Sequence, residues 1–133
     1  MLRISSRLDY GIIILQTLAK LTKRGPVSLG AIAGLNNLPY RYLTRIIQPL
    51  KKAGLVKAQE GKRGGYTLNK PPAKITLHEI VQILEPKKEL TRCTSTSHST
   101  CSLKYSCPMA PWWMKFNTKL ELMLKKITLK DLL

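Results

Sequence analysis

The chain has 133 residues, of which 44% are hydrophobic, and this length is typical of one small domain with a modest core. Twenty-three Lys and Arg residues oppose seven Asp and Glu residues, so the formal net charge is +16 at pH 7. A charge of this size repels itself unless an anionic partner lies against the protein. The composition therefore favours nucleic acid as the partner.

The sequence disfavours a membrane location. Its apolar run "GIIIL" is far too short to span a bilayer. The N-terminal segment imitates a signal peptide, but Asp9 interrupts it and no clean small-residue cleavage site follows. We therefore expect a soluble, cytoplasmic protein. An odd number of cysteines in a reducing compartment indicates metal or redox chemistry rather than stable disulfides.

The first expected helix covers residues 8–22, where apolar side chains recur at intervals of three and four. These side chains are Leu8, Ile12, Leu15 and Ala19. The stretch "KRGP" then breaks the chain. Ser28 can cap a second, short helix through "LGAIAGL", and Asn36 and Asn37 tolerate a left-handed turn conformation.

A third expected helix begins at Pro39 and ends before Gly54, a suitable C-cap. Pro49 removes one backbone donor within it, which predicts a kink. Two short helices joined by a tight turn predict a helix-turn-helix, although two ordinary packed helices with a basic face give the same pattern. Strand-like patterns in "LVKAQEG" and "GYTLNK" flank the basic turn "GKRG", and this hairpin favours a winged helix.

Two further helices are expected after the hairpin. Thr76 and Glu79 form a capping box for a fourth helix, which Pro86 ends. Beyond Pro111 a long helix carries an apolar stripe that is most economically covered by a second copy of the chain. The stripe consists of Trp112, Phe116, Leu120 and Leu124. Residues 128–131 can cap one final short helix.

The expected fold is therefore mostly α with a small β-hairpin: a winged helix-turn-helix plus a long dimerisation helix. Residues 1–85 form the winged helix-turn-helix DNA-binding domain. Residues 86–110 form a cysteine-containing, cluster-binding loop. Residues 111–133 form the dimerisation helix and a short C-terminal helix.

Candidate DNA contacts lie on the third helix and at the hairpin tip. Arginines four residues apart share a helix face and can form bidentate hydrogen bonds to guanine, whereas lysines supply contacts to phosphate. The predicted DNA-binding residues are Tyr40, Arg41, Thr44, Arg45, Lys51, Lys62 and Arg63. For any one of them, a merely solvated side chain is an equally good interpretation.

All three cysteines lie in one polar segment. Cys93, Cys101 and Cys107 have seven and then five residues between them, a spacing that fits structural zinc sites poorly. Iron–sulfur clusters bind thiolates by preference and span wider loops. The spacing therefore favours a cluster, while zinc and unligated or redox-active thiols stay open.

Several stretches together resemble the Rrf-two family of bacterial winged-helix repressors. They are "LDYGIIIL", "PVSLGAIA", "YLTRIIQPLKKAGLV", "GGYTLNKPPAKITLHEIV" and the three spaced cysteines before the tryptophan pair. The similarity covers nearly the whole chain. It implies a homodimer with crossing long helices, a palindromic operator on double-stranded DNA, and a cluster held by the three cysteines.

Departures from the family pattern bear on the cluster. The two-iron branch completes its site with a histidine where this chain has Ala110, so a 4Fe-4S cluster is favoured over 2Fe-2S. In the nitric-oxide-sensing branch an aspartate from the other subunit is the fourth ligand, and Asp9 falls at the matching position. His98 is an alternative ligand, and Asp9 can instead stabilise the start of a helix. Relatives often carry arginine where this chain has Glu60, so Lys62 and Arg63 are the better wing contacts.

These features predict a transcription regulator, a repressor, whose iron–sulfur cluster senses iron, nitric oxide or redox state. An alternative is a basic nucleic-acid-binding protein with structural zinc or incidental thiols. An enzyme is not expected, because the two histidines and seven carboxylates form no recognisable acid–base or nucleophile constellation.

Overall fold

The computed structural model describes residues 3–86, 89–94, 101–103 and 106–133. Its helices and strands in chain order are α1 (Ser6–Leu21), η1 (Thr22–Arg24), α2 (Leu29–Asn36), α3 (Tyr40–Lys52), β1 (Val56–Gln59), β2 (Gly65–Leu68), η2 (Pro72–Lys74), α4 (Leu77–Leu84), η3 (Arg92–Thr94), α5 (Ala110–Lys126) and η5 (Leu129–Leu132). The predicted fold, mostly helical with one small hairpin, is confirmed. No helix of the described residues is long and apolar enough to cross a membrane.

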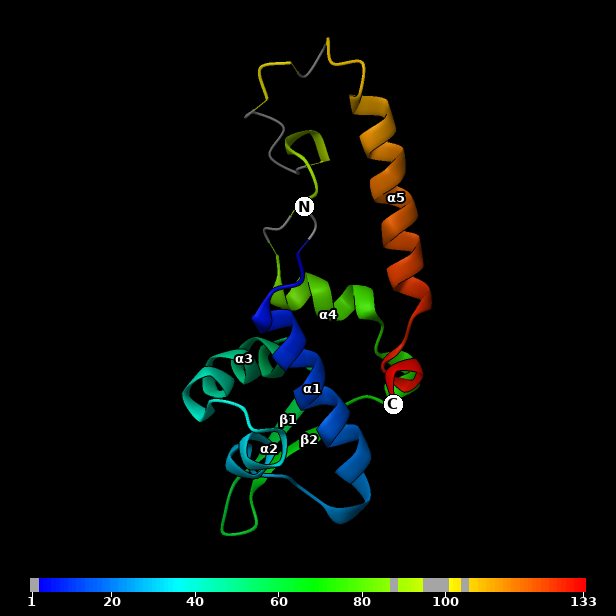
Figure 1. Ribbon diagram of the computed structural model, residues 1–133. Helices are drawn as coiled ribbons and strands as arrows, with labels where there is room; N and C mark the ends of the chain where they lie inside the picture. The colour runs from blue at the N-terminus through cyan, green and yellow to red at the C-terminus, as the bar shows by residue number, and fades with distance from the viewer. Residues whose placement is uncertain (1–2, 87–88, 95–100, 104–105) are drawn as a thin grey trace.

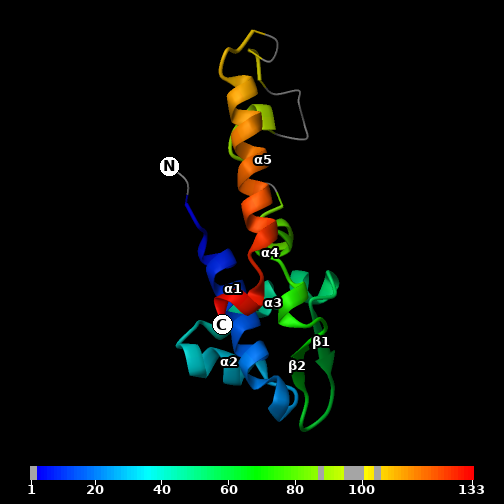
Figure 2. The same cartoon turned by 90° about the vertical axis from the view of Figure 1, so that its right-hand side faces the viewer.

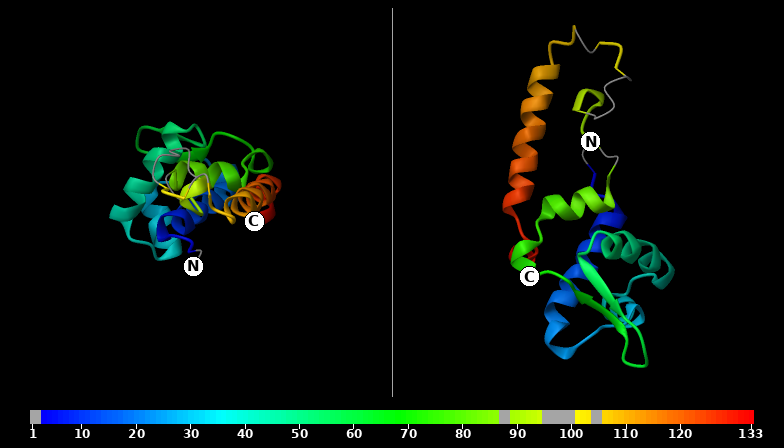
Figure 3. Two further views of the ribbon diagram at one scale, coloured as in Figure 1. Left: turned by 90° about the horizontal axis from the view of Figure 1, so that it is seen from above. Right: turned by 180° about the vertical axis from the view of Figure 1, so that it is seen from behind.

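The molecule has a compact head and one protruding arm. Figure 1 shows α1 to α4 and the hairpin gathered together, while α5 rises from them. The view turned by 90° in Figure 2 and the view from behind in Figure 3 agree: the hairpin turn lies at one end of the molecule, and residues 101–103 lie at the other, beyond the start of α5.

Side-chain caps determine where three helices begin. Ser5 accepts a hydrogen bond from the Leu8 N–H at 3.2 Å, so α1 starts two residues earlier than the apolar stripe indicates. Ser28 caps α2 as predicted, and Asn37 at its end is left-handed, with φ of 55°. These short polar side chains satisfy backbone donors that would otherwise lack a partner at a helix end.

The predicted capping box on α4 is half correct. Thr76 accepts from the Glu79 N–H at 3.1 Å. The Glu79 carboxylate does not return this bond to the backbone but pairs with Lys70 Nζ at 2.7 Å. The side chain of Lys70, just before the prolines, thereby links the end of the hairpin to the start of α4.

Helix α3 is continuous from Tyr40 to Lys52 and contains Pro49. Pro39 is its N-cap rather than its first helical residue, and Gly54 follows the C-cap with φ of 78°. The kink that Pro49 predicts stays a prediction. Four side chains of α3 are fully buried: Leu43, Ile46, Ile47 and Leu50. Their spacing leaves the opposite face of the helix, with Arg41, Arg45 and Gln48, exposed.

The core lies between α1, α3 and α4. Gly11 on α1 allows the closest approach, because a Cβ added there would lie 2.2 Å from Leu84 Cδ1 and 3.5 Å from Ile46 Cγ2. Both neighbours are almost completely buried. The three helices can therefore pack this tightly only because position 11 has no side chain.

The hairpin is tied to the helices by a backbone bridge. β1 and β2 are antiparallel, with Val56 opposite Leu68 and Gln59 opposite Gly65. The Val27 N–H donates to the Tyr66 carbonyl, and the Tyr66 N–H donates back to Val27, at 2.9 and 2.8 Å. The segment entering α2 thus acts as a short third edge of the sheet and holds the wing beside the helix-turn-helix.

The chain returns to the head after α5. Residues 127–133, which we call the C-terminal clasp, donate and accept main-chain bonds at the start of α4: Leu77 N–H to Ile127 at 2.8 Å, and Leu129 N–H to Ile75 at 2.8 Å. Gln16 of α1 donates to the Leu132 carbonyl. Leu129 is 0% exposed. The base of the arm is therefore part of the core.

The expected short helix at residues 128–131 is confirmed as η5. A capping box closes it, in which Thr128 and Asp131 exchange side-chain and backbone bonds. The Thr128 N–H and hydroxyl both donate to the Asp131 carboxylate, at 2.8 and 2.7 Å. These bonds favour the charged form, so the pKa of Asp131 is lowered.

We expect Gly11→Ala to destabilise the protein. The new methyl group must displace the buried Leu84 side chain, and overpacking of this kind costs about 1–3 kcal/mol, offset by up to about 1 kcal/mol of improved helix propensity. The measurement is chemical denaturation. Gly34→Ala on α2 is the matched control, because no atom lies within 4 Å of its added Cβ. Equal stabilisation by both variants would contradict the tight contact.

We expect Leu129→Ala to cost about 2–5 kcal/mol in the free energy of unfolding, because it leaves a cavity beneath the clasp. Leu133→Ala, four residues away and 50% exposed, should change that free energy by less than about 0.5 kcal/mol. Thermal and urea unfolding measure both variants. If Leu129→Ala behaved like its exposed neighbour, the clasp would not belong to the core.

Candidate DNA interface and cysteine segment

The exposed face of α3 carries the predicted reading residues. Arg41 and Arg45 are exposed and lie one helical turn apart. Thr44 donates its hydroxyl to the Arg41 carbonyl at 2.7 Å, so its methyl group is the part available for contact. The structure therefore brings the two guanidinium groups onto one face without any ion pair to them among the described residues.

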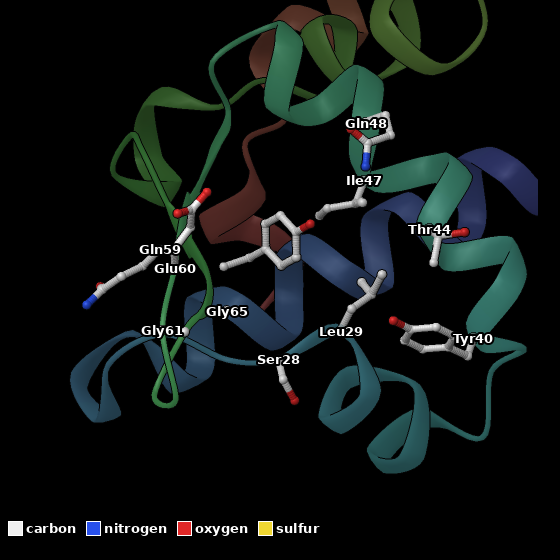
Figure 4. Close-up of a pocket in the computed structure, with 12 residues that line it drawn as sticks. Ser28, Leu29, Tyr40, Thr44, Ile47, Gln48, Gln59, Glu60, Gly61 and Gly65 are labelled. Carbon is white, nitrogen blue, oxygen red and sulfur yellow. The ribbon is translucent and has the colours of Figure 1, made fainter.

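The aromatic residues at the start of α3 divide into two roles. Tyr40 is 54% exposed, and its ring points toward the space between α3 and α2 (Figure 4). Tyr42 turns inward and packs edge-on against Tyr10, with ring centroids 5.6 Å apart. Tyr40 thus remains a candidate contact, while Tyr42 supports the position of α3.

The remaining predicted cations occupy two places. Lys51 and Lys52 are exposed in the last turn of α3, where their positive charges interact favourably with the negative end of the helix dipole. Lys62 and Arg63 are exposed at the hairpin tip. The Gly64 N–H donates to the Gly61 carbonyl at 3.0 Å, which closes a tight turn with both cations at its corner.

A cation-lined groove connects the wing with the helices. It has a volume of about 600 Å³, and Lys62 and Arg63 lie on its hairpin side, opposite Arg24 and the start of α2. The sequence interpretation missed Arg24, although the basic pair in "KRGP" next to a capping serine was a usable signal. Cations around a helix start form a suitable site for phosphate.

A second groove, of about 400 Å³, separates α3 from the hairpin. Thr44 and Gln48 of α3 lie on one side, Glu60 and the wing glycines on the other, and Leu29 and Ile47 form part of its floor (Figure 4). Among the residues that the structure describes, no lysine or arginine lines it. Glu60 is an exposed carboxylate on the otherwise basic wing.

The three cysteines lie between α4 and α5, and all are free and partly buried. Cys93 is in η3, which packs against α5, and its sulfur lies 3.0 Å from the Thr91 hydroxyl. The Cys107 N–H donates to the Leu103 carbonyl at 2.9 Å, two residues before the N-cap of α5. The sequence thus places all three thiols on one segment at the arm.

The described part of the chain does not assemble the predicted ligand set. Across residues 3–86, 89–94, 101–103 and 106–133, no three His, Cys, Asp or Glu side chains are grouped so as to hold a metal ion. Asp9 is exposed in the first turn of α1, where Ser5 rather than Asp9 is the cap. His98 lies outside the described residues. The thiol donors suit iron–sulfur chemistry, but their arrangement here does not by itself form a site.

The apolar stripe of α5 has two parts. Leu120 and Leu124 lie beside Val81 of α4 and so pack within the chain. Nearer the cysteines, Trp112 is 52% exposed and stacks on Phe116 with ring centroids 5.3 Å apart. Further large apolar side chains are exposed on the arm: Met109, Met114, Leu122 and Met123.

Two short helices joined by a tight turn, the second with a basic outer face, are followed by a basic hairpin. This combination defines a winged-helix DNA-binding protein. The Rrf2 family model, described as an iron-dependent transcriptional regulator, matches residues 4–133. The chain therefore belongs to the Rrf2 family, as the resemblance indicated, and is a transcriptional regulator rather than an enzyme.

Individual relatives agree with this assignment. The chain is 31% identical to the transcriptional regulator NsrR of Halalkalibacterium halodurans over 132 residues, which are 99% of this chain and 90% of that protein. It is 44% identical to CymR of Bacillus subtilis over 84 residues, only 63% of this chain and 61% of the relative. The solved structure of CymR, described as the global cysteine regulator of B. subtilis, superimposes with a TM-score of 0.79 and 34% identity, covering 99% of this chain and 96% of that one.

We expect the double substitution Lys62→Ala and Arg63→Ala to weaken DNA binding about equally for all sequences. Each lost phosphate contact should reduce the slope of log K against log salt by about 0.9. Fluorescence anisotropy across a salt series measures the slope. Lys115→Ala with Lys119→Ala removes the same charge from exposed positions on α5. An equal change in the slope for that control would show that net charge, not the wing, determines it.

Proposed function

We propose that this protein is a cytoplasmic, dimeric transcription repressor that recognises a palindromic operator and responds to an iron–sulfur cluster. Arg41, Arg45, Tyr40 and Thr44 contact the major groove, and Lys51, Lys62 and Arg63 contact phosphates. Cys93, Cys101 and Cys107 hold the cluster, with Asp9 as a fourth ligand. The observation that carries the proposal is three free thiols on one segment of an Rrf2-family regulator.

DNA binding through α3 is supported by exposure and charge. The inner face of α3 is buried in the core, while its arginines project outward. The wing tip adds cations beside it. Arginine can bond guanine O6 and N7 in a bidentate manner, and apolar methyl groups such as that of Thr44 can contact thymine. In this arrangement the wing contributes affinity through phosphate contacts, and α3 contributes sequence specificity through base contacts.

Dimer formation is supported by the arm. Exposed large apolar side chains gather on α5, which protrudes from the head, and the described residues leave them uncovered. Such surfaces on a protein of this size mark sites of association. A two-fold dimer matches a two-fold operator, because each reading helix then meets one half-site.

Cluster binding is supported by the chemical type of the three cysteine thiols rather than by their positions in the structure. Thiolates are the ligands that iron–sulfur clusters prefer, and a bound cluster supplies redox and ligand-exchange chemistry at iron. Three cysteines leave a fourth ligand to be found. The exposed Asp9 is accessible to a second copy of the chain, and oxygen donors bind iron more weakly than thiolates. A four-iron cluster is favoured over a two-iron cluster, because Ala110 stands where a histidine would complete the latter.

The segment that carries the thiols is well placed to influence the reading head. η3 packs on α5, α5 packs on α4, and α4 packs on both α1 and α3. A ligand that orders the cysteine segment can therefore favour one placement of the two heads over another. Only such a difference between the two states can change DNA affinity.

A second function is favoured by the separation of the thiols. Free cysteines that do not gather around a metal can act directly as redox switches. The structural match to CymR, the global cysteine regulator, is consistent with a family member that responds to sulfur chemistry rather than to iron. In this alternative, the event that changes DNA binding is oxidation of a cysteine thiol rather than loss of a cluster.

Anaerobic purification tests the proposal. We expect brown protein with thiolate-to-iron charge-transfer absorbance and with iron and sulfide in matching amounts. Cys107→Ala should lose the absorbance, the iron and the sulfide together, because it removes one of the proposed cysteine ligands. Ser106→Ala is the matched control. Native mass spectrometry should give a dimer for both variants, which separates loss of the cluster from loss of the fold.

Colourless, iron-free protein whose DNA binding still changes on mild oxidation would contradict the cluster and support the thiol switch. Stoichiometric zinc would contradict both.

A further inference from the structure

The two grooves on the DNA-facing side differ in charge. The groove at the wing tip is lined by Arg24, Lys62 and Arg63, whereas the described residues that line the groove between α3 and the hairpin include no cation but do include the Glu60 carboxylate. A phosphate is attracted to the first and repelled from the second. The second groove is therefore suited to groups that donate hydrogen bonds, and the amino groups of adenine and cytosine are such groups in the major groove.

Gln48 lies at the α3 edge of this second groove. It is exposed, and among the described residues no hydrogen bond of its amide to the rest of the protein is found. Figure 4 shows it on α3 above Ile47, facing the hairpin, whereas the other groove glutamine, Gln59, extends away from α3. The Gln48 amide is thus a donor and acceptor pair that the fold itself does not use.

The position of Gln48 continues the reading face. It follows Thr44 by four residues and Arg41 by seven, so the three side chains lie on one side of α3. Seven residues of helix advance about 10 Å, which corresponds to about three base pairs at 3.4 Å each. One helix can therefore present Arg41 and Gln48 to different base pairs of the same half-site.

We propose that Gln48 is a specificity-determining residue that selects adenine at one position of each half-site. Its amide is able to donate to N7 and accept from the N6 amino group of adenine. The proposal rests on the DNA contact of α3 proposed above, and on no property of the cluster.

In vitro selection from randomised DNA tests this assignment, using the wild-type chain and three variants. We expect Gln48→Ala to keep the two-fold motif but lose the preference for adenine at one symmetric position, by roughly 5- to 150-fold in relative affinity. Gln48→Glu should move that preference to cytosine, because a carboxylate accepts from the N4 amino group. The remote, exposed Gln82→Ala on α4 is the matched control and should leave the motif unchanged.

Two results would overturn the assignment. An unchanged motif for Gln48→Ala would mean that the side chain reads no base. A uniform loss for all sequences with a smaller salt slope would mean that it contacts phosphate. If the wild-type chain itself enriches no motif, the proposed operator binding is contradicted instead. Circular dichroism of each variant checks that its fold is intact. Because selection is repeated on protein with and without iron, failure of the cluster proposal leaves this test unaffected.

Discussion

The packing of α4 across α1 and α3 is the contact on which the rest of the structure depends. α4 is only eight residues long, yet its Ile80 and Leu84 are almost fully buried, and Leu84 fills the space that Gly11 leaves open on α1. Its first residue is bonded to the C-terminal clasp, and its last leads into the cysteine segment. One short helix therefore connects the reading helix, the arm and the thiols.

The two ends of α5 are held very differently. Its C-terminal end continues into the clasp, where Leu129 is buried and main-chain bonds join it to Ile75 and Leu77. Its N-terminal end carries exposed Trp112 and Met109 and follows the cysteine segment. At its base α5 packs on α4, and η5 just beyond it packs on α1, so this end of the arm is joined directly to the head.

Local chemistry made much of this fold predictable. The helix start at Ser28, the left-handed Asn37 and the short hairpin depend on a few neighbouring residues, and the structure confirms them. Glu79 was misassigned because its partner, Lys70, belongs to another part of the chain. The burial of Leu129 and the contact at Gly11 also depend on distant partners, and Arg24 shares a groove with Lys62 and Arg63 only because the wing folds beside it. The thiols show the same limit, because their spacing along the chain does not reveal which other side chains lie near them in space.

Charge on this protein is segregated in a way that suits a sequence reader. Three of its seven carboxylates, Glu85, Glu89 and Glu121, line a groove between α4, η3 and α5, away from the wing. By contrast, Glu60 lies on the hairpin, close in sequence to Lys62 and Arg63. A carboxylate there weakens attraction to the phosphate backbone of every DNA equally, and it can be compensated only where a base presents an amino group. A net charge of +16 attracts the phosphate backbone of any DNA, and a carboxylate across the groove from Gln48 opposes that attraction at one point of the surface.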